Sequence, residues 1–109
     1  MLSFEEAEIR SSVIKALAHP VRLIIVDLLK DGEKRFWEIK KAFGADKSTI
    51  SKHLSVLKAA GIVSSRRHGG DMIYRLEVPC IVDFFACVTA VIENSVRRQA
   101  MCLCKDRRG

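Results

Sequence analysis

Apolar side chains recur every three or four residues over most of the chain, which is the spacing of one face of an α-helix. The pattern predicts helices over about residues 4–18, 20–30, 33–44, 47–60 and 80–101. Pro20 suits the first turn of the second helix, and we expect His19 to cap that helix. Asp46 is a good N-cap for the fourth helix. Gly44 is expected to close the third helix in the left-handed conformation.

The period changes to two between the fourth and last helices. The segments "IVSSRR" and "MIYRL" are separated by "HGGD", whose glycines permit positive φ, so a β-hairpin is predicted over about residues 63–76. A helix, a turn and a second helix rich in small polar residues make a helix-turn-helix, and the hairpin behind it makes a wing. The expected fold is therefore mainly α with a small β-hairpin, a winged helix-turn-helix ordered α-α-α-α-β-β-α in a single domain of residues 1–109.

The length of 109 residues suits one domain, and the net charge of +6 favours an acidic partner such as nucleic acid. The start "MLSFEEAEIR" has no apolar core of a secretory signal, so we expect the protein in the cytoplasm. The apolar stretch "CIVDFFACVTAVI" contains Asp83 and is shorter than the roughly 20 residues of a membrane span. No membrane association is expected.

The positive charge concentrates on the fourth helix and the hairpin. Residues 46–76 contain six lysines and arginines against only Asp46 and Asp71. Short polar and basic side chains let a helix approach base edges in the major groove, and arginines on a hairpin suit phosphates or a narrow minor groove. The candidate DNA-binding residues are Lys47, Ser48, Thr49, Ser51, Lys52 and His53 on the recognition helix, and Arg66, Arg67, His68 and Arg75 on the wing. The alternatives are a solvated helix face and, for His68, a solvent-facing turn residue rather than a metal ligand.

The segments "ALAHPVRLIIVDLL" and "GADKSTISKHLSVLKAAGIVSSRRHGGDMIYRL" resemble the ArsR/SmtB family of small winged-helix repressors. The resemblance implies a homodimer joined by its first and last helices, residues 4–18 and 80–101. It also implies binding to a palindromic double-stranded DNA operator and release by an effector, with no cofactor needed to bind DNA. The family's recognition-helix pattern coincides with residues 47–53, and its wing with residues 66–75.

Two metal sites of that family are missing. Arg35 and Trp37 stand where many arsenic and cadmium sensors have a Cys-x-Cys. The last helix has Asp83 and Glu93 but no histidine, unlike the zinc sensors. We expect Trp37, with Phe36, to pack under the recognition helix instead.

A dimer is also predicted from the last helix itself. Its apolar residues occupy more than one stripe, which is more apolar surface than one small core can cover. These residues are Ile81, Phe84, Phe85, Val88, Val91, Ile92 and Val96.

The four cysteines are expected to be thiols, metal ligands or redox sensors rather than disulfides, because the cytoplasm is reducing. Cys102 and Cys104 lie in the tail "AMCLCKDRRG". Helical residues two apart point about 200° apart, so a site shared within one chain needs the helix to end near Met101. Antiparallel pairing about an axis near residues 92–94 would instead bring Cys80 and Cys87 near the tail thiols of the other subunit.

The effector remains open at this point. Arsenite, another soft metal ion or a thiol oxidant would act on a thiolate site made of Cys80, Cys87, Cys102 and Cys104. Alternatively, Cys80 and Cys87 are core residues and the tail thiols are incidental, or a small organic metabolite binds between helices. A thiol oxidoreductase is a weaker alternative, because no Cys-x-x-Cys begins a helix. A winged helix used only for protein contact would not need so polar a recognition helix.

Overall fold

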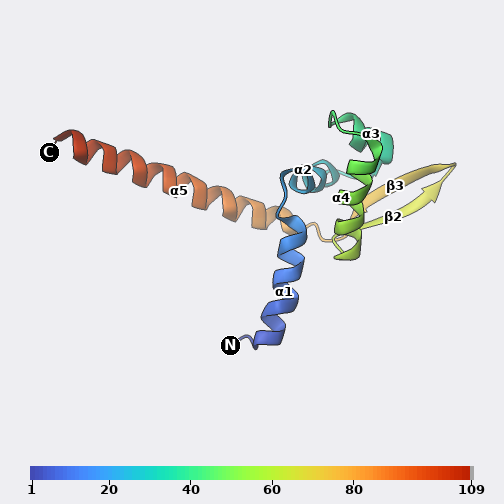
Figure 1. Ribbon diagram of the computed structural model, residues 1–109, viewed down its shortest axis with the longest axis horizontal. Coiled ribbons are helices and arrows are strands. Elements are labelled where there is room, and N and C mark those ends of the chain that lie inside the picture. The colour runs from blue at the N-terminus through green and yellow to red at the C-terminus, as the bar shows by residue number, and fades with distance from the viewer. Residues whose placement is uncertain (109) are drawn as a thin grey trace. The chain divides into compact units, whose positions relative to one another are not determined.

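The computed structural model describes the backbone of residues 1–108 and the side chains of residues 1–99. Residues Met1–Pro79 form one compact unit, and α5 belongs to a second unit that begins at Cys80. The elements, labelled in Figure 1, are α1 (Phe4–Leu17), α2 (Pro20–Leu29), β1 (Lys34–Arg35), α3 (Phe36–Lys41), α4 (Lys47–Ala59), β2 (Val63–His68), β3 (Asp71–Leu76) and α5 (Ile81–Arg108). The winged helix-turn-helix fold is confirmed, with one strand more than the sequence predicts.

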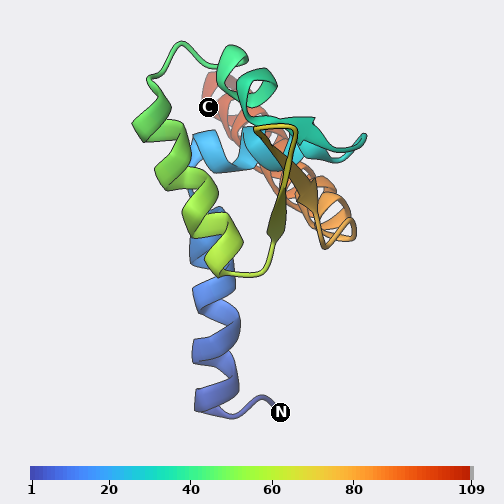
Figure 2. The ribbon, with the colours of Figure 1, turned by 90° about the vertical axis from the view of Figure 1, so that its right-hand side faces the viewer.

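The core of the first unit lies between α2, α4 and the sheet, and α4 runs beside α2 (Figure 2). Helix α4 contributes an apolar stripe at helical spacing, Ile50, Leu54 and Leu57, each at most 1% exposed. Each such side chain contributes roughly 1.5–3 kcal/mol when it is fully buried. The other buried apolar residues are Ala16, Leu17, Ile25, Val26, Leu29, Ile39, Ile62, Val63, Ile73 and Leu76.

The expected caps of α2 and α4 are confirmed. His19 Nδ1 accepts a hydrogen bond from Val21 N at 3.1 Å, and Pro20 occupies the first turn of α2. Asp46 Oδ1 accepts from Thr49 N at 3.3 Å at the start of α4. At its end, Gly61 takes φ of 80°, while Gly61 N and Ile62 N donate to the carbonyls of Lys58 and Leu57. This paired pattern is a Schellman motif, so both ends of α4 are fixed by local hydrogen bonds.

The wing is the hairpin of β2 and β3, whose turn projects beyond the helices (Figure 1). Gly69 and Gly70 have φ of 58° and 87°, which is the two-residue turn that the glycine pair predicts. Strand β1 pairs with the other edge of β3, so the sheet has three antiparallel strands in the order β1-β3-β2.

The predicted third helix is wrong at both ends. Lys34 and Arg35 are in β1, because their backbone pairs with Tyr74 and Ile73 of β3, a contact between distant residues that periodicity does not reveal. Helix α3 ends at Lys41, and Gly44 is not among the glycines with positive φ.

The predicted packing of Trp37 under the recognition helix is also wrong. Its side chain is 53% exposed, because Ile39 is the residue of α3 that fills the core. Phe36 is half-buried and its ring centroid lies 6.4 Å from that of Tyr74 in β3.

Helix α1 is buried only at its C-terminal end, at Ala16 and Leu17. Its N-terminal part extends beyond the rest of residues 1–79 (Figure 2) and leaves Phe4, Ile9 and Ile14 exposed.

Helix α5 continues to Arg108, so the expected helix end near residue 101 is wrong; no proline or glycine interrupts the segment. Its apolar stripe is exposed: Phe84, Val88, Val91, Ile92 and Val96 are 43–64% accessible. No helix among the described residues has the length and apolar character of a membrane span.

The exposed stripe of α5 generates a prediction about assembly. We expect a dimer of the 12.2 kDa chain at micromolar concentration, because water otherwise contacts this stripe. Ile92→Lys places a charge within the stripe and should weaken association at least about tenfold. Ala90→Lys adds the same charge on the opposite side of the helix and should leave the dimer intact. Equilibrium sedimentation of the three proteins measures this, and a parent that sediments as a monomer would contradict it.

Candidate nucleic-acid interface

The exposed side of α4 lies opposite its buried stripe, as the 3.6-residue period requires. Lys47, Ser48, Thr49 and Lys52 are exposed on this side, whereas Ser51 is half-buried. Among the described residues, Lys47 and Lys52 take part in no side-chain hydrogen bond or ion pair. Their ammonium groups are therefore free to meet a polyanion.

The hydroxyl groups at the start of α4 already have a partner. Ser48 Oγ donates to Asp46 Oδ2 at 2.9 Å, and Thr49 Oγ1 donates to Asp46 Oδ1. The hydrogen bonds from Thr49 and Ser48 lower the pKa of the Asp46 carboxyl, which therefore stays ionised. With their protons held by Asp46, both hydroxyls present lone pairs outward, so they are suited to accept from base amino groups.

His53 is placed differently from its neighbours on α4. The ring is half-buried, and its Nδ1 accepts from Arg22 Nε of α2 at 3.1 Å. Its centroid lies 4.3 Å from that of His19. Only the other ring nitrogen remains for a contact outside the protein, so the predicted base contact of His53 is restricted to Nε2.

Two of the predicted phosphate-binding arginines of the wing are paired with carboxylates that lie outside the hairpin. Arg66 donates from both terminal nitrogens to Glu33, at 2.5 and 2.9 Å, and Arg75 donates to Glu77 at 3.1 Å. The hydrogen bond from Arg66 lowers the pKa of Glu33, and those from Ser64 and Arg75 lower the pKa of Glu77. Both acids are charged at neutral pH, so a phosphate must compete with them.

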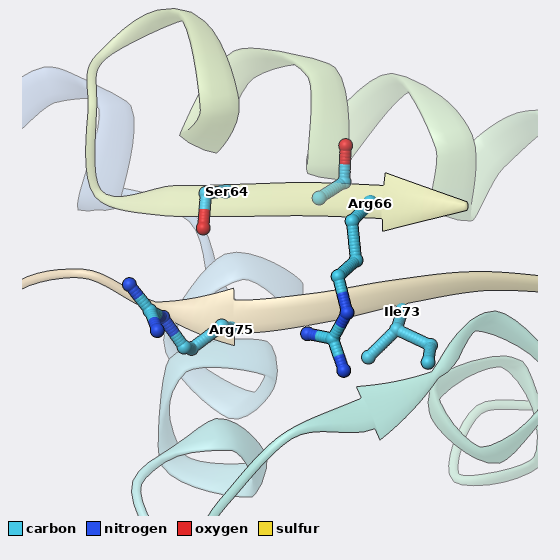
Figure 3. Close-up of a pocket in the computed structure, with 5 residues that line it drawn as sticks. Ser64, Arg66, Ile73 and Arg75 are labelled. Carbon is cyan, nitrogen blue, oxygen red and sulfur yellow. The ribbon is translucent and has the colours of Figure 1, made fainter. Parts of the chain in front are cut away.

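Figure 3 shows these arginines on one face of the sheet. The side chain of Arg66 crosses β3 beside Ile73, while Arg75 lies toward the other end of the hairpin near Ser64. Together with Ser65 these residues line a shallow open hollow. The stem of Arg66 covers Ile73, which is only 8% exposed although it lies on the outer face.

Arg67 and His68 are exposed near the turn of the wing. In the described part of the chain neither makes a side-chain hydrogen bond or an ion pair. A third surface pair links Arg35 to Asp71 at 2.9 Å. Arg67 is therefore the wing arginine whose charge is not already matched by an acid.

The candidate thiolate site is described only in part. Cys80 and Cys87 are free and exposed, so they are not core residues of this chain. The side chains of Cys102 and Cys104 lie outside the described residues. Within the described residues, no group of three or more histidine, cysteine or acidic side chains could hold a metal ion.

Residues 19–65, which include α2, α3 and α4, match the family described as bacterial regulatory protein, arsR family. An uncharacterised HTH-type transcriptional regulator of Mycobacterium tuberculosis is 34% identical over 86 residues, which are 78% of this chain and 75% of the relative. The chain belongs to the ArsR family. It is also similar to the transcriptional repressor SdpR of Bacillus subtilis, with 37% identity over 67% of this chain and 81% of the repressor.

Solved ArsR-type structures agree with this assignment. The crystal structure of Rv0081 from Mycobacterium tuberculosis has a TM-score of 0.77 and 30% identity, covering 90% of this chain and 99% of the other. The solution structure of a homodimeric winged helix-turn-helix DNA-binding domain from Mycobacterium bovis has a TM-score of 0.71 and 34% identity, covering 89% and 93%. The family is one of DNA-binding transcriptional regulators and not of enzymes.

Sequence reasoning missed three residues that shape this ArsR-family surface. Glu33 and Glu77 hold wing arginines, and Arg22 holds His53. Glu77 directly follows the basic segment of residues 46–76 and Glu33 lies well before it, so the charge balance of that segment does not include either acid. No local pattern indicates the partner of Arg22, which is 31 residues away.

The Glu33 contact generates a prediction about DNA affinity. Glu33→Gln keeps the shape of the side chain but removes its charge, so Arg66 is freed for a phosphate. Affinity for DNA of any sequence should rise about twofold to fivefold, and the salt slope should steepen by up to about 0.9. Asp31→Asn removes one negative charge from a residue that pairs with no arginine among the described side chains, and it serves as the matched control. Equal effects of the two variants in salt titrations would show that Arg66 does not contact phosphate.

Proposed function

We propose that this chain is a homodimeric transcriptional repressor that binds a palindromic operator through α4 and the wing. The observation that carries the proposal is the exposed polar face of α4, a helix fixed at both ends. On this face Lys47 and Lys52 lie beside Ser48 and Thr49 and have no ion-pair partner among the described side chains. Repression is supported by the similarity to the repressor SdpR. A dimer is supported by the exposed stripe of α5 and by the homodimeric neighbour from Mycobacterium bovis.

The proposal divides the work between the two elements. Residues Lys47, Ser48, Thr49, Ser51, Lys52 and His53 read the operator sequence from the major groove. Residues Arg66, Arg67, His68 and Arg75 bind the DNA backbone or the minor groove. Such a protein acts where the chromosome lies, so we also propose a cytoplasmic location.

Substitutions on α4 and on the wing should have different effects. Lys47→Ala should relax the preference at one base position of each half-site by roughly tenfold, as expected for a lost base contact. Lys58→Ala, on the last turn of the same helix, removes an equal charge and should keep the preference. Arg67→Ala should weaken binding to all sequences alike and lower the salt slope by about 0.9.

The measurement is binding of each protein to duplexes selected by the parent from a random library. The selected sequences should be palindromic, with half-sites centred about one or two helical turns apart. A parent that selects no sequence would contradict the proposed function. Sequence-dependent losses for Arg67→Ala would show that wing and helix have exchanged roles.

For the effector, we propose a soft metal ion such as arsenite, or a thiol oxidant, acting on cysteines across the dimer. Cys80 and Cys87 are free thiols and are exposed, which supports a site shared between the two subunits. The version within one chain required the helix to end near residue 101, and α5 continues past it. A thiolate bridge between subunits would change the spacing of the two recognition helices.

Replacing Cys102 and Cys104 together with serine tests this effector proposal. Operator complexes of the double variant should resist release by arsenite, other soft metals and oxidant, while the parent releases DNA. The double variant Cys80→Ser with Cys87→Ser tests whether the two cysteines near the start of α5 are also needed for release. If both double variants release DNA as readily as the parent, the cysteines are not the sensor, and a small organic metabolite becomes the alternative.

A further inference from the structure

Arg22 connects three helices at one point of the fold. From the first turns of α2, its Nε donates to His53 Nδ1 of α4 at 3.1 Å, and one terminal nitrogen donates to the carbonyl of Ala16 at 3.2 Å. Ala16 is in the last turn of α1, where helix carbonyls have no partner within the helix. The guanidinium thus caps α1 and holds α4 at the same time.

The geometry requires a neutral imidazole on α4. A guanidinium has only donors, so His53 Nδ1 accepts and must carry no proton. Nδ1 of the neighbouring His19 likewise accepts a hydrogen bond, from Val21 N. The two rings lie 4.3 Å apart between centroids, so a proton on either ring would face the other ring and the fixed charge of Arg22.

The groups around His53 all disfavour its charged form. Burial, then His19 and Arg22, lower the pKa of the His53 imidazole. Helix α1 supplies a carbonyl through Arg22, and β2 presents the uncharged Val63 and Ser65 on the side of the sheet toward α4.

The residues of α4 one turn from His53 are uncharged. They are Thr49, Ile50, Val56 and Leu57. The adjacent Lys52 is exposed and adds positive charge. In this part of the described chain, no carboxylate is hydrogen-bonded to His53 or Arg22 to offset a proton.

We propose that Arg22 is a positioning residue that fixes the recognition helix to the end of α1 through neutral His53, and that protonation of this histidine releases the helix and lowers operator specificity. The proposal rests on the proposed DNA-binding function and extends it: His53 positions α4 through Nδ1, while its Nε2 remains for a base contact. Arg22 thereby joins α1, which carries an exposed apolar face, to the recognition helix.

The direction of the pH effect follows from the lowered pKa. As pH falls below about 6.5, the unfolded or released histidine binds a proton before the held one does. The junction is therefore complete above that pH and is lost as pH decreases. Added positive charge meanwhile strengthens binding to all DNA, so the affinity ratio between operator and shuffled DNA isolates the positioning effect.

The first test measures that ratio at about pH 7.5 and pH 5.5 at constant ionic strength, using a duplex selected by the parent at the higher pH. For the parent the ratio should fall about tenfold, the value of one hydrogen bond to a charged group. His53→Asn places an amide oxygen where Nδ1 was and cannot be protonated, so its ratio should change less than about twofold. His68→Asn removes the exposed wing histidine, whose proposed backbone contact acts on all sequences alike, so the ratio should still fall as in the parent.

Arg22→Lys separates position from charge. Lysine keeps the positive charge but lacks the planar fork that reaches both acceptors. The ratio should be about tenfold lower at both pH values, with affinity for shuffled DNA nearly unchanged. His19→Asn keeps an N-cap on α2 and should reduce the pH effect less than His53→Asn does.

A readout without DNA distinguishes this inference from the proposed function. The NMR signal of Arg22 Nε–H should shift with the titration of His53 in the parent and stay constant in His53→Asn. A parent that binds no selected duplex but shows this coupling would refute the repressor function and retain the junction. Three results would each overturn the inference. The affinity ratio of His53→Asn could fall with pH as much as that of the parent, the ratio of Arg22→Lys could equal the parental one, or the NMR signal of Arg22 could be independent of His53.

Discussion

Burial of one apolar stripe on α4 is the constraint on which the rest of the interface depends. Ile50, Leu54 and Leu57 are almost fully buried against α2 and the sheet. Because side chains on a helix rotate with a fixed period, burying this stripe turns the polar residues at the start of α4 outward. The Asp46 cap and the Gly61 Schellman motif then fix where the helix begins and ends. Hydrophobic burial and local backbone chemistry together determine which side chains of α4 are exposed.

Electrostatics on the wing modify the simple picture of a basic hairpin. Arg66 and Arg75 are matched by Glu33 and Glu77, which contribute little to stability at an exposed surface but hold the guanidinium groups in place. Net charge along the sequence therefore overstates the charge that is free at the wing. Of the candidate DNA-binding cations, Arg67 near the turn and Lys47 and Lys52 on α4 form no ion pair among the described residues, so their charge is free to attract a polyanion.

A second constraint comes from the exposed apolar faces of α1 and α5, which are in contact with water unless a partner covers them. Helix α1 is buried only at its C-terminal end, and α5 exposes a stripe of apolar side chains. The winged helix-turn-helix domain from Mycobacterium bovis, to which this chain is similar, is a homodimer. Arg22 donates to a carbonyl at the C-terminal end of α1 and to His53 of α4, so the end of α1 and the candidate recognition helix are joined through one side chain. A displacement of the end of α1 would therefore move Arg22, and with it the hydrogen bond to His53 of α4.

The sequence by itself determined the elements that depend on local chemistry. The His19 and Asp46 caps and the Gly69-Gly70 turn are properties of neighbouring residues, and each of these predictions is confirmed. The family and its winged fold followed from the same local segments. The candidate reading face of α4 was predictable too, because it is the complement of an apolar stripe.

Tertiary structure alone decided the contacts between distant residues. Strand β1 exists because Lys34 and Arg35 pair with β3, so the helix predicted from residue 33 begins only at Phe36. The exposure of Trp37, the carboxylate partners of the wing arginines and the bond from Arg22 to His53 have the same origin. Each depends on which side chains the folded backbone brings within hydrogen-bonding or packing distance, and no local pattern carries that information.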